Sequence, residues 1–246
     1  TLYEYAEVKA SVPEENRQQH HRLCPQPLCW RRDDDNLLRH GPFWVYRWGD
    51  AAPPAPADFA DGTDMLFFWG HHQKGEQPGA SCLSQWYKQD FRIGAERFCC
   101  MEQYMMAHKA YLFGDEATEE QIMKAQQPAE IKELGRAVSG FSQTIWDRYK
   151  YNIVLTGNYY KFAQSPALLQ YLTSTGETIL VEASPVDTVW GVGLAQNAAD
   201  IHTPAKWRGQ NLLGFALMAV RQELRRVWGN RQYIDWPAFQ NKMAAP

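Results

Sequence analysis

The stretch MEQYMMAHKA, residues Met101–Ala110, is the starting point for interpreting this chain. An α-helix turns by about 100° per residue, so Glu102 and Lys109, seven positions apart, point within roughly 20° of each other. Met105 and Met106 lie on the same stripe, so we expect the acid and the amine to face the core. Buried charges are costly unless they are paired, solvated in a cleft or used in chemistry, so the pair marks a candidate site. The opposite face, expected to face solvent, carries Gln103, Tyr104, Ala107, His108 and Tyr111.

Helical patterns dominate the sequence after this stretch. Thr118-x-x-Gln121 has the form of a capping box and predicts a helix from about Glu119. Pro128 and Pro166 suit first helical positions and predict two further helices. Apolar residues at helical spacing predict a long helix over 145–162 and a last helix over 211–227.

Strand signals are fewer. Thr178–Ala183 is the clearest strand, and Pro42–Trp48 and Asp64–Trp69 are two more candidates, which we expect to pair antiparallel. The sequence therefore predicts a helix-rich α+β fold with a small β-sheet. The three prolines among residues 51–56 separate an N-terminal extension and linker, 1–62, from the main domain, 63–246.

Composition excludes several functions. A net charge of −3 argues against broad wrapping of a nucleic-acid duplex, but it leaves room for a nucleotide or base in a pocket. No segment approaches the about 20 apolar residues needed to span a bilayer. Five cysteines, an odd number, and a polar start without a secretory signal favour a cytoplasmic or nuclear setting. Cys24 and Cys29 follow two histidines but lack a second pair at zinc spacing, so no metal is predicted.

A second candidate segment follows the strand that ends near Ala183. Asp187-x-x-Trp190-Gly191-x-Gly193 places a carboxylate and a large ring on a tight loop, where glycines let the backbone approach a ligand. A purely structural alternative is that Trp190 fills the core and Asp187 caps a turn.

A third segment opens the last helix. Asn211 is placed to act as an N-cap, and a helix N-terminus also suits an anionic phosphate, with Arg208 three residues earlier.

Taken together, these segments resemble the NADAR family, the YbiA-like N-glycosidases, from Phe67 to Arg225. The resemblance rests on Phe67-Phe68-Trp69-Gly70 followed by Leu83-Ser84-Gln85-Trp86, on the Glu102…Lys109 helix, on Asp187-x-x-Trp190-Gly191-x-Gly193, and on Asn211-Leu212-Leu213-Gly214. It implies a YbiA-like domain that needs no cofactor.

The resemblance also implies roles for individual residues. Glu102 matches a catalytic glutamate, with an ion pair to Arg92 or Arg97 as the structural alternative. Lys109 would either trap a ring-opened ribose as a Schiff base or bind phosphate or hydroxyl groups. Asp187 would position the ribose. The expected substrate-binding residues are Phe68, Trp69, Ser84, Trp86, Trp190, Gly191, Gly193, Arg208 and Asn211.

The function implied is hydrolysis of a bond between ribose and a base. One substrate class is ADP-ribose attached to the amino group of guanine, in DNA or a nucleotide, and the abundant aromatic residues favour this larger ligand. The alternative class is the phosphoribosylamino pyrimidines of riboflavin synthesis. Two readings of other kinds remain open: a non-catalytic ADP-ribose or nucleotide reader, and a structural helical domain. No obligatory protein partner is predicted.

Overall fold

The structure is a computed structural model, which describes residues 53–73, 75–93 and 96–229 and the backbone of four two-residue strands elsewhere. The helices are α2 (Met101–Leu112), α3 (Glu116–Lys124), α4 (Pro128–Arg136), α5 (Gln143–Ala163), α6 (Pro166–Ser174) and α7 (Leu212–Gly229), with short 3-10 turns η1 (Pro56–Asp58), η2 (Ala80–Leu83) and η3 (Pro204–Lys206). The strands are β1 (Glu7–Val8), β2 (Pro27–Leu28), β3 (Val45–Tyr46), β4 (Met65–Phe68), β5 (Phe91–Ile93), β6 (Glu96–Phe98), β7 (Ile179–Glu182) and β8 (Ile234–Asp235).

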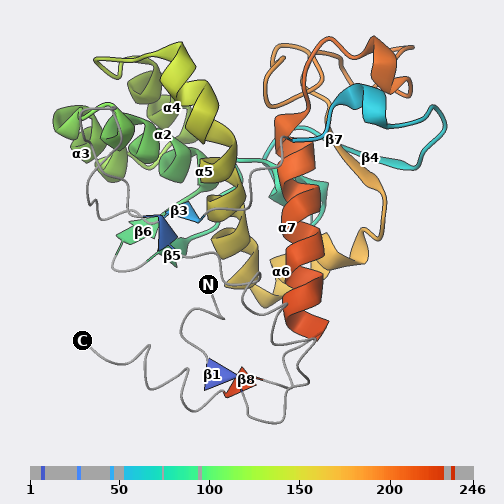
Figure 1. Ribbon diagram of the computed structural model, residues 1–246, viewed down its shortest axis with the longest axis horizontal. Coiled ribbons are helices and arrows are strands. Elements are labelled where there is room, and N and C mark those ends of the chain that lie inside the picture. Colours follow the sequence, from blue (N-terminus) through green and yellow to red (C-terminus); the bar gives the residue numbers. More distant parts are fainter. Residues whose placement is uncertain are drawn as a thin grey trace.

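The long helix α5 runs between two halves of the molecule. On one side it packs against α2, and α3 and α4 cover α2 in turn; on the other side it packs against α7, which covers β7 (Figure 1). The predicted helix-rich α+β class is confirmed.

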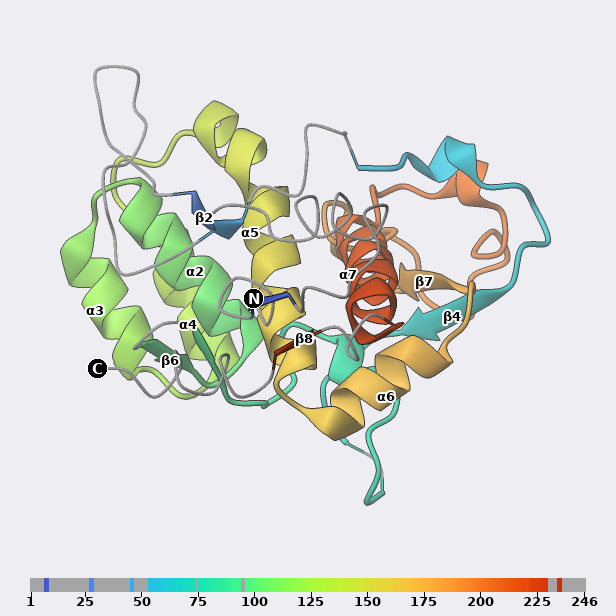
Figure 2. The same ribbon diagram turned by 60° about the horizontal axis from the view of Figure 1, so that its bottom comes forward.

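The strand pairing differs from the expectation. β4 pairs in parallel with β7, from Met65 opposite Ile179 to Phe68 opposite Glu182, and the two strands lie side by side beside α7 (Figure 2). β3 pairs instead with β2, so the expected antiparallel pair between residues 42–48 and 64–69 is wrong. Parallel strands are typically covered on both faces and read as continuous apolar runs, which suits the Ile-Leu-Val of β7 better than a hairpin does.

The predicted outer face of α2 is also wrong. Gln103, Tyr104 and His108 are buried, because other elements cover the face that the sequence assigned to solvent. Gln103 faces the end of α3, and the Tyr104 ring packs against Phe91 of β5 and Phe98 of β6. The Gln103 amide donates hydrogen bonds to the carbonyls of Ile122 and Ala125, at 3.0 and 2.9 Å. These carbonyls lie at and just beyond the end of α3, where backbone carbonyls lack the regular helical hydrogen bonds, so a polar side chain is favourable there.

Helix starts follow local chemistry. Pro128 and Pro166 open α4 and α6 as predicted. The predicted start of α3, near Glu119, is too late, because the helix begins at Glu116. Asp115 is its N-cap and accepts a hydrogen bond from the Thr118 backbone N–H at 3.1 Å. An aspartate is as good a cap as threonine, and it comes earlier in the chain.

The division into residues 1–62 and 63–246 stays a prediction, and Cys24 and Cys29 lie outside the described residues. Within the part that is described, no helix has the length and apolar character needed to cross a bilayer.

Candidate active site

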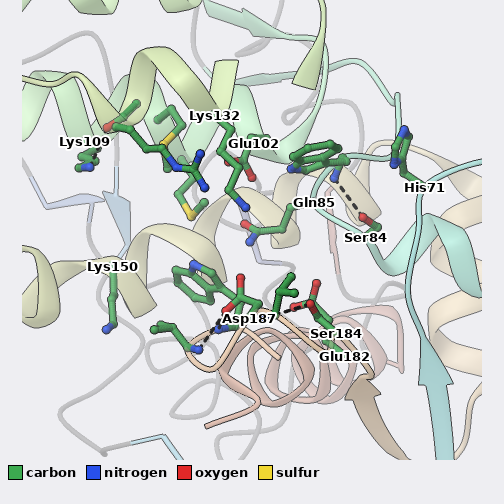
Figure 3. A pocket seen from close by; sticks show the side chains of 18 of the residues that line it. His71, Ser84, Gln85, Glu102, Lys109, Lys132, Lys150, Glu182, Ser184 and Asp187 are labelled. Atoms are coloured by element: carbon green, nitrogen blue, oxygen red, sulfur yellow. Dashed lines mark hydrogen bonds between the residues drawn. The ribbon is translucent and has the colours of Figure 1, made fainter. Parts of the chain in front are cut away.

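A cavity of about 760 Å³ opens between the helical half and the loop that follows β7 (Figure 3). α2, α4 and the start of α5 supply one wall, and β7 with residues 184–190 supplies the facing wall. Residues 84–86 and 69–72 close the remaining side. Binding pockets for small ligands typically measure about 300–1,000 Å³, so a nucleotide-sized molecule fits this cavity.

Glu102 lies in the first turn of α2 and lines the cavity while being almost wholly buried. Its backbone N–H donates to the carbonyl of Gln85 at 3.0 Å, which ties the helix start to the 84–86 loop. Burial raises the pKa of Glu102 to about 7, against the opposing effects of nearby Lys132 and a hydrogen bond from the Trp86 side chain. A carboxyl group whose pKa lies near 7 can both release and accept a proton at physiological pH, so it is suited to general acid–base catalysis.

The structure does not contain the alternative ion pair between Glu102 and Arg92 or Arg97. Arg97 bonds Asp90 instead, and the side chain of Arg92 is exposed. The cations that act on Glu102 are Lys132 and, more weakly, Arg136, which both line the cavity.

Lys109 lines the same cavity two turns further along α2. Its Nζ donates to the carbonyl of Gly135 at 2.7 Å and sits 4.2 Å from the centre of the Phe141 ring. Burial lowers the pKa of Lys109, while the negative charge of Glu102 acts to raise it. A lowered amine pKa increases the neutral, nucleophilic fraction, so the position allows both of the roles expected for Lys109.

Asp187 lies across the cavity from Glu102 (Figure 3), and Trp190 lines the same cavity. One oxygen of Asp187, Oδ1, accepts hydrogen bonds from the backbone N–H groups of Val189 and Trp190 at 2.9 and 2.8 Å. Asp187 therefore caps a turn and lines the cavity at once, and Trp190 both packs against the core and borders the cavity. The structural and the ligand-binding interpretations of this loop are both compatible with its geometry.

Three of the expected substrate-binding residues, Trp69, Ser84 and Trp86, also line the cavity. Trp69 is 64% exposed and stands at the opening. The Ser84 hydroxyl accepts a hydrogen bond from the Trp86 backbone N–H at 3.2 Å, which shapes the loop that carries the Trp86 ring.

Five other expected residues do not line the cavity, namely Phe68, Gly191, Gly193, Arg208 and Asn211. Phe68 belongs to the core, and Arg208 is exposed away from the cavity. Gly193 has a φ of +68°, which a side chain rarely adopts, and a Cβ on Gly191 would lie 2.8 Å from the Glu182 carbonyl. The two glycines therefore shape the backbone of the loop without lining the cavity.

Asn211 also lies outside the cavity lining and bonds the backbone of β7. Its amide donates to the carbonyl of Leu180 at 2.9 Å and accepts from the backbone N–H of Glu182 at 3.0 Å. A Cβ on Gly214 would lie 2.0 Å from the same Leu180 carbonyl, so the glycine lets α7 approach β7 closely. The Asn211–Gly214 motif thus holds the end of β7 in place.

Several residues that line the cavity were not predicted from the sequence. Glu182, the last residue of β7, borders the cavity, and so do the cations Lys132, Arg136 and Lys150 on α4 and α5. Trp146 adds a further aromatic wall. Two features of the sequence could have indicated them. Glu182 is a charged residue directly after three apolar strand residues, and the three cations are basic residues of two amphipathic helices. Among the described residues, no group of three or more His, Cys, Asp or Glu is placed to hold a metal ion.

The NADAR domain family matches residues 67–225. The chain belongs to the NADAR family. N-glycosidase R617 of Acanthamoeba polyphaga mimivirus is 46% identical over 65% of this chain and 97% of its own length. The riboflavin biosynthesis protein VVA0006 of Vibrio vulnificus is 28% identical over 64% of this chain but only 42% of its own length.

The fold comparison agrees. The solved structure of Escherichia coli YbiA superimposes with a TM-score of 0.54 at 23% identity, covering 66% of this chain and 86% of that protein. The predicted family and YbiA-like fold are confirmed, and so, at the level of a family with named N-glycosidases, is the predicted enzyme class.

Proposed function

We propose that this NADAR protein cleaves the N-glycosidic bond between ribose and the amino group of guanine, releasing ADP-ribose from DNA or a nucleotide. The observation that carries the proposal is the make-up of the cavity. Carboxyl groups of Glu102 and Asp187 border the same space as the amine of Lys109 and an outer set of cations. Glycosidases use paired carboxyl groups to handle the charge and protons at the sugar carbon.

The cations suit the diphosphate of the substrate. Lys132 and Arg136 on α4 and Lys150 on α5 border the cavity. Lys132 lies on the side of the cavity opposite Asp187 (Figure 3). Lys and Arg side chains are the usual partners of phosphate groups. A volume of about 760 Å³ bordered by four tryptophan rings favours a ligand with two nucleotide halves over one small phosphoribosyl group. These rings are Trp69, Trp86, Trp146 and Trp190.

Chemically, C1′ becomes oxocarbenium-like as the C1′–N bond breaks and its electron pair moves to the base. Glu102, with its pKa near 7, stabilises this charge or exchanges a proton with a ribose hydroxyl. Asp187 positions the ribose and Trp190 forms a wall of the pocket. Lys109 either binds a phosphate or hydroxyl oxygen, or its neutral amine forms a bond to C1′. In the second case the C1′–O4′ bond opens and O4′ takes a proton from the amine nitrogen, which gives a protonated Schiff base that water hydrolyses to the aldehyde and the free amine.

A direct assay tests the proposal. A guanine-ADP-ribosylated oligonucleotide is incubated with the protein, and free ADP-ribose is measured by chromatography and mass spectrometry. We expect release by the wild type and at least about a 100-fold loss in Glu102→Gln, the usual scale for an acid–base group. Binding of ADP-ribose without release by the wild type would instead favour the non-catalytic reader.

The similarity to a riboflavin biosynthesis protein supports a second candidate, a phosphoribosylamino pyrimidine substrate. Release of ribose 5-phosphate from such a compound, measured beside the first assay, separates the two substrates. The cytoplasmic or nuclear setting and the absence of an obligatory protein partner stay predictions.

A further inference from the structure

Glu182 lies at the cavity end of β7 with its backbone held on every side. Its N–H donates to Asn211 Oδ1 at 3.0 Å, and its carbonyl accepts from the N–H groups of Ser184 at 2.9 Å and Val192 at 3.0 Å. Gly191 also packs closely against this carbonyl, since a Cβ on Gly191 would lie 2.8 Å from its oxygen. A side chain carried on so rigid a support is well placed to act on a bound ligand.

The side chain itself is less well satisfied than the backbone. Its Oε2 is sealed from solvent and accepts no hydrogen bond within the described part of the chain, although Glu182 lines the cavity. Buried polar atoms are nearly always bonded, so such an oxygen calls for an explanation. A neutral carboxyl group, or a partner supplied by the ligand, would each provide one.

The neighbouring carboxyl groups have partners that Glu182 lacks. Glu102 accepts a hydrogen bond from the Trp86 side chain and faces Lys132, and Asp187 accepts two backbone N–H groups. Around Glu182 the acting groups are Asp187 and Glu102, both acidic, and Lys132, whose opposing influence is the smallest of the three. Of the three acids, Glu182 is therefore the one best suited to keep its proton.

We propose that Glu182 is the general acid of this site, the carboxyl group that protonates the leaving nitrogen of the base. The inference rests on the proposed glycosidase function and adds to it a residue that no sequence motif had indicated.

The step balances in atoms and charge. The C1′–N bond breaks, its electron pair goes to the amino nitrogen of guanine, and that nitrogen takes the proton of the Glu182 carboxyl group. Water then adds its oxygen to C1′, and its proton restores the carboxyl group of Glu182. If Lys109 attacks first, water hydrolyses the resulting Schiff base, and the proton returned to Glu182 again comes from water.

Burial, with the charges of Asp187 and Glu102, raises the pKa of Glu182 to about 8, so the proton is present at neutral pH. The wild-type rate should accordingly fall as the pH rises through about 8.

The experiment compares single-turnover release of ADP-ribose from the oligonucleotide between pH 6 and pH 10. For Glu182→Gln we expect a loss of about 10²–10⁴-fold at pH 7, together with loss of the alkaline fall. Glu182→Asp keeps a carboxyl group and should retain more activity than the glutamine variant. Glu119→Gln is the matched control, because Glu119 is also a partly buried carboxyl group with a pKa raised to about 7, but it lies on α3 outside the cavity lining.

ADP-ribose binding, measured by calorimetry, separates a catalytic role from a structural one. An unchanged dissociation constant in Glu182→Gln with the stated loss of rate supports the proposal. Three results overturn it: an unchanged rate, a fall in binding as large as the fall in rate, or an alkaline limb that persists in the glutamine variant. If the wild type itself releases nothing, the proposed function fails instead, and the inference falls with it.

Discussion

Replacing Glu182 by glutamine should stabilise the protein at alkaline pH, even though it removes a proposed catalytic group. The folded-state pKa of Glu182 is about 8, whereas the ordinary value is 4.5. Between these two pH values the folded state therefore binds a proton that the unfolded state has released. The contribution of Glu182 to stability is fully present below about pH 4.5 and is lost as the pH rises through about 8.

The magnitude follows from the pKa difference. One pKa unit corresponds to about 1.4 kcal/mol, so the change from 4.5 to about 8 amounts to about 5 kcal/mol at most. Local relaxation and entry of water around the ionised group reduce the measured cost of burying a charge. We therefore expect the free energy of unfolding of Glu182→Gln, relative to wild type, to increase by about 2–4 kcal/mol between pH 5 and pH 9.

Urea denaturation at pH 5, 7 and 9 and constant ionic strength provides the measurement, with equal m-values as the check that both proteins unfold alike. Glu120→Gln is the control: Glu120 is exposed, and its hydrogen bond to Lys124 lowers its pKa, so its removal should not produce this alkaline gain. Parallel stability curves for wild type and Glu182→Gln would show that Glu182 ionises freely in the folded protein. The electrostatic basis of the proposed general acid would then be refuted.

Three further predictions concern Gly214 and Lys161, which support the site, and Lys109 within it. Gly214→Ala, which places a Cβ 2.0 Å from the Leu180 carbonyl, should lower the free energy of unfolding by about 1–3 kcal/mol in urea denaturation. Lys161 donates to the Cys82 and Ser84 carbonyls, so Lys161→Met should cost about 1–3 kcal/mol at pH 7 in the same assay. Burial lowers the pKa of Lys161 to about 8, so wild type should gain stability over that variant as the pH rises from about 8 toward 10.5. If Lys109 forms a Schiff base, borohydride added during turnover should leave a ribose adduct on the Lys109 peptide, and Lys109→Arg should show none.

Local rules recovered most of the helices from the sequence. Pro128 and Pro166 mark true helix starts, and the seven-residue spacing of Glu102 and Lys109 places both at one cavity. The rules failed where a helix is covered on all sides. Gln103 is an ordinary outer-face residue by polarity, but it is buried because it completes the bonds at the end of α3. Periodicity in one helix carries no information about a second helix that packs on its polar face.

The sequence identified the segments around the cavity more reliably than the position of each residue within them. Asn211 and Gly191 were expected to contact the substrate, yet both act on the backbone that carries Glu182. Sequence alone does not distinguish a residue that binds a ligand from one that holds the binding residue, because both need a specific side chain. Glu182 was missed for the opposite reason: it is one charge at the end of a strand, and its importance appears only when β7 is placed beside the cavity.

The supports around Glu182 bear on how such a site is maintained. Burial of the Glu182 Oε2 atom without a hydrogen bond disfavours the ionised carboxylate. The side chain would be better solvated if it turned toward water, so the fold must keep it in place. Asn211 accepts from the Glu182 N–H, and Gly191 packs against the Glu182 carbonyl, so both restrain the backbone of that residue. Two neighbouring contacts, from the Asn211 amide and Gly214 to the Leu180 carbonyl, fix β7 against α7 two residues earlier. The end of β7 is therefore held from both sides, which supports the proposal that the position of this carboxyl group matters to the function of the cavity.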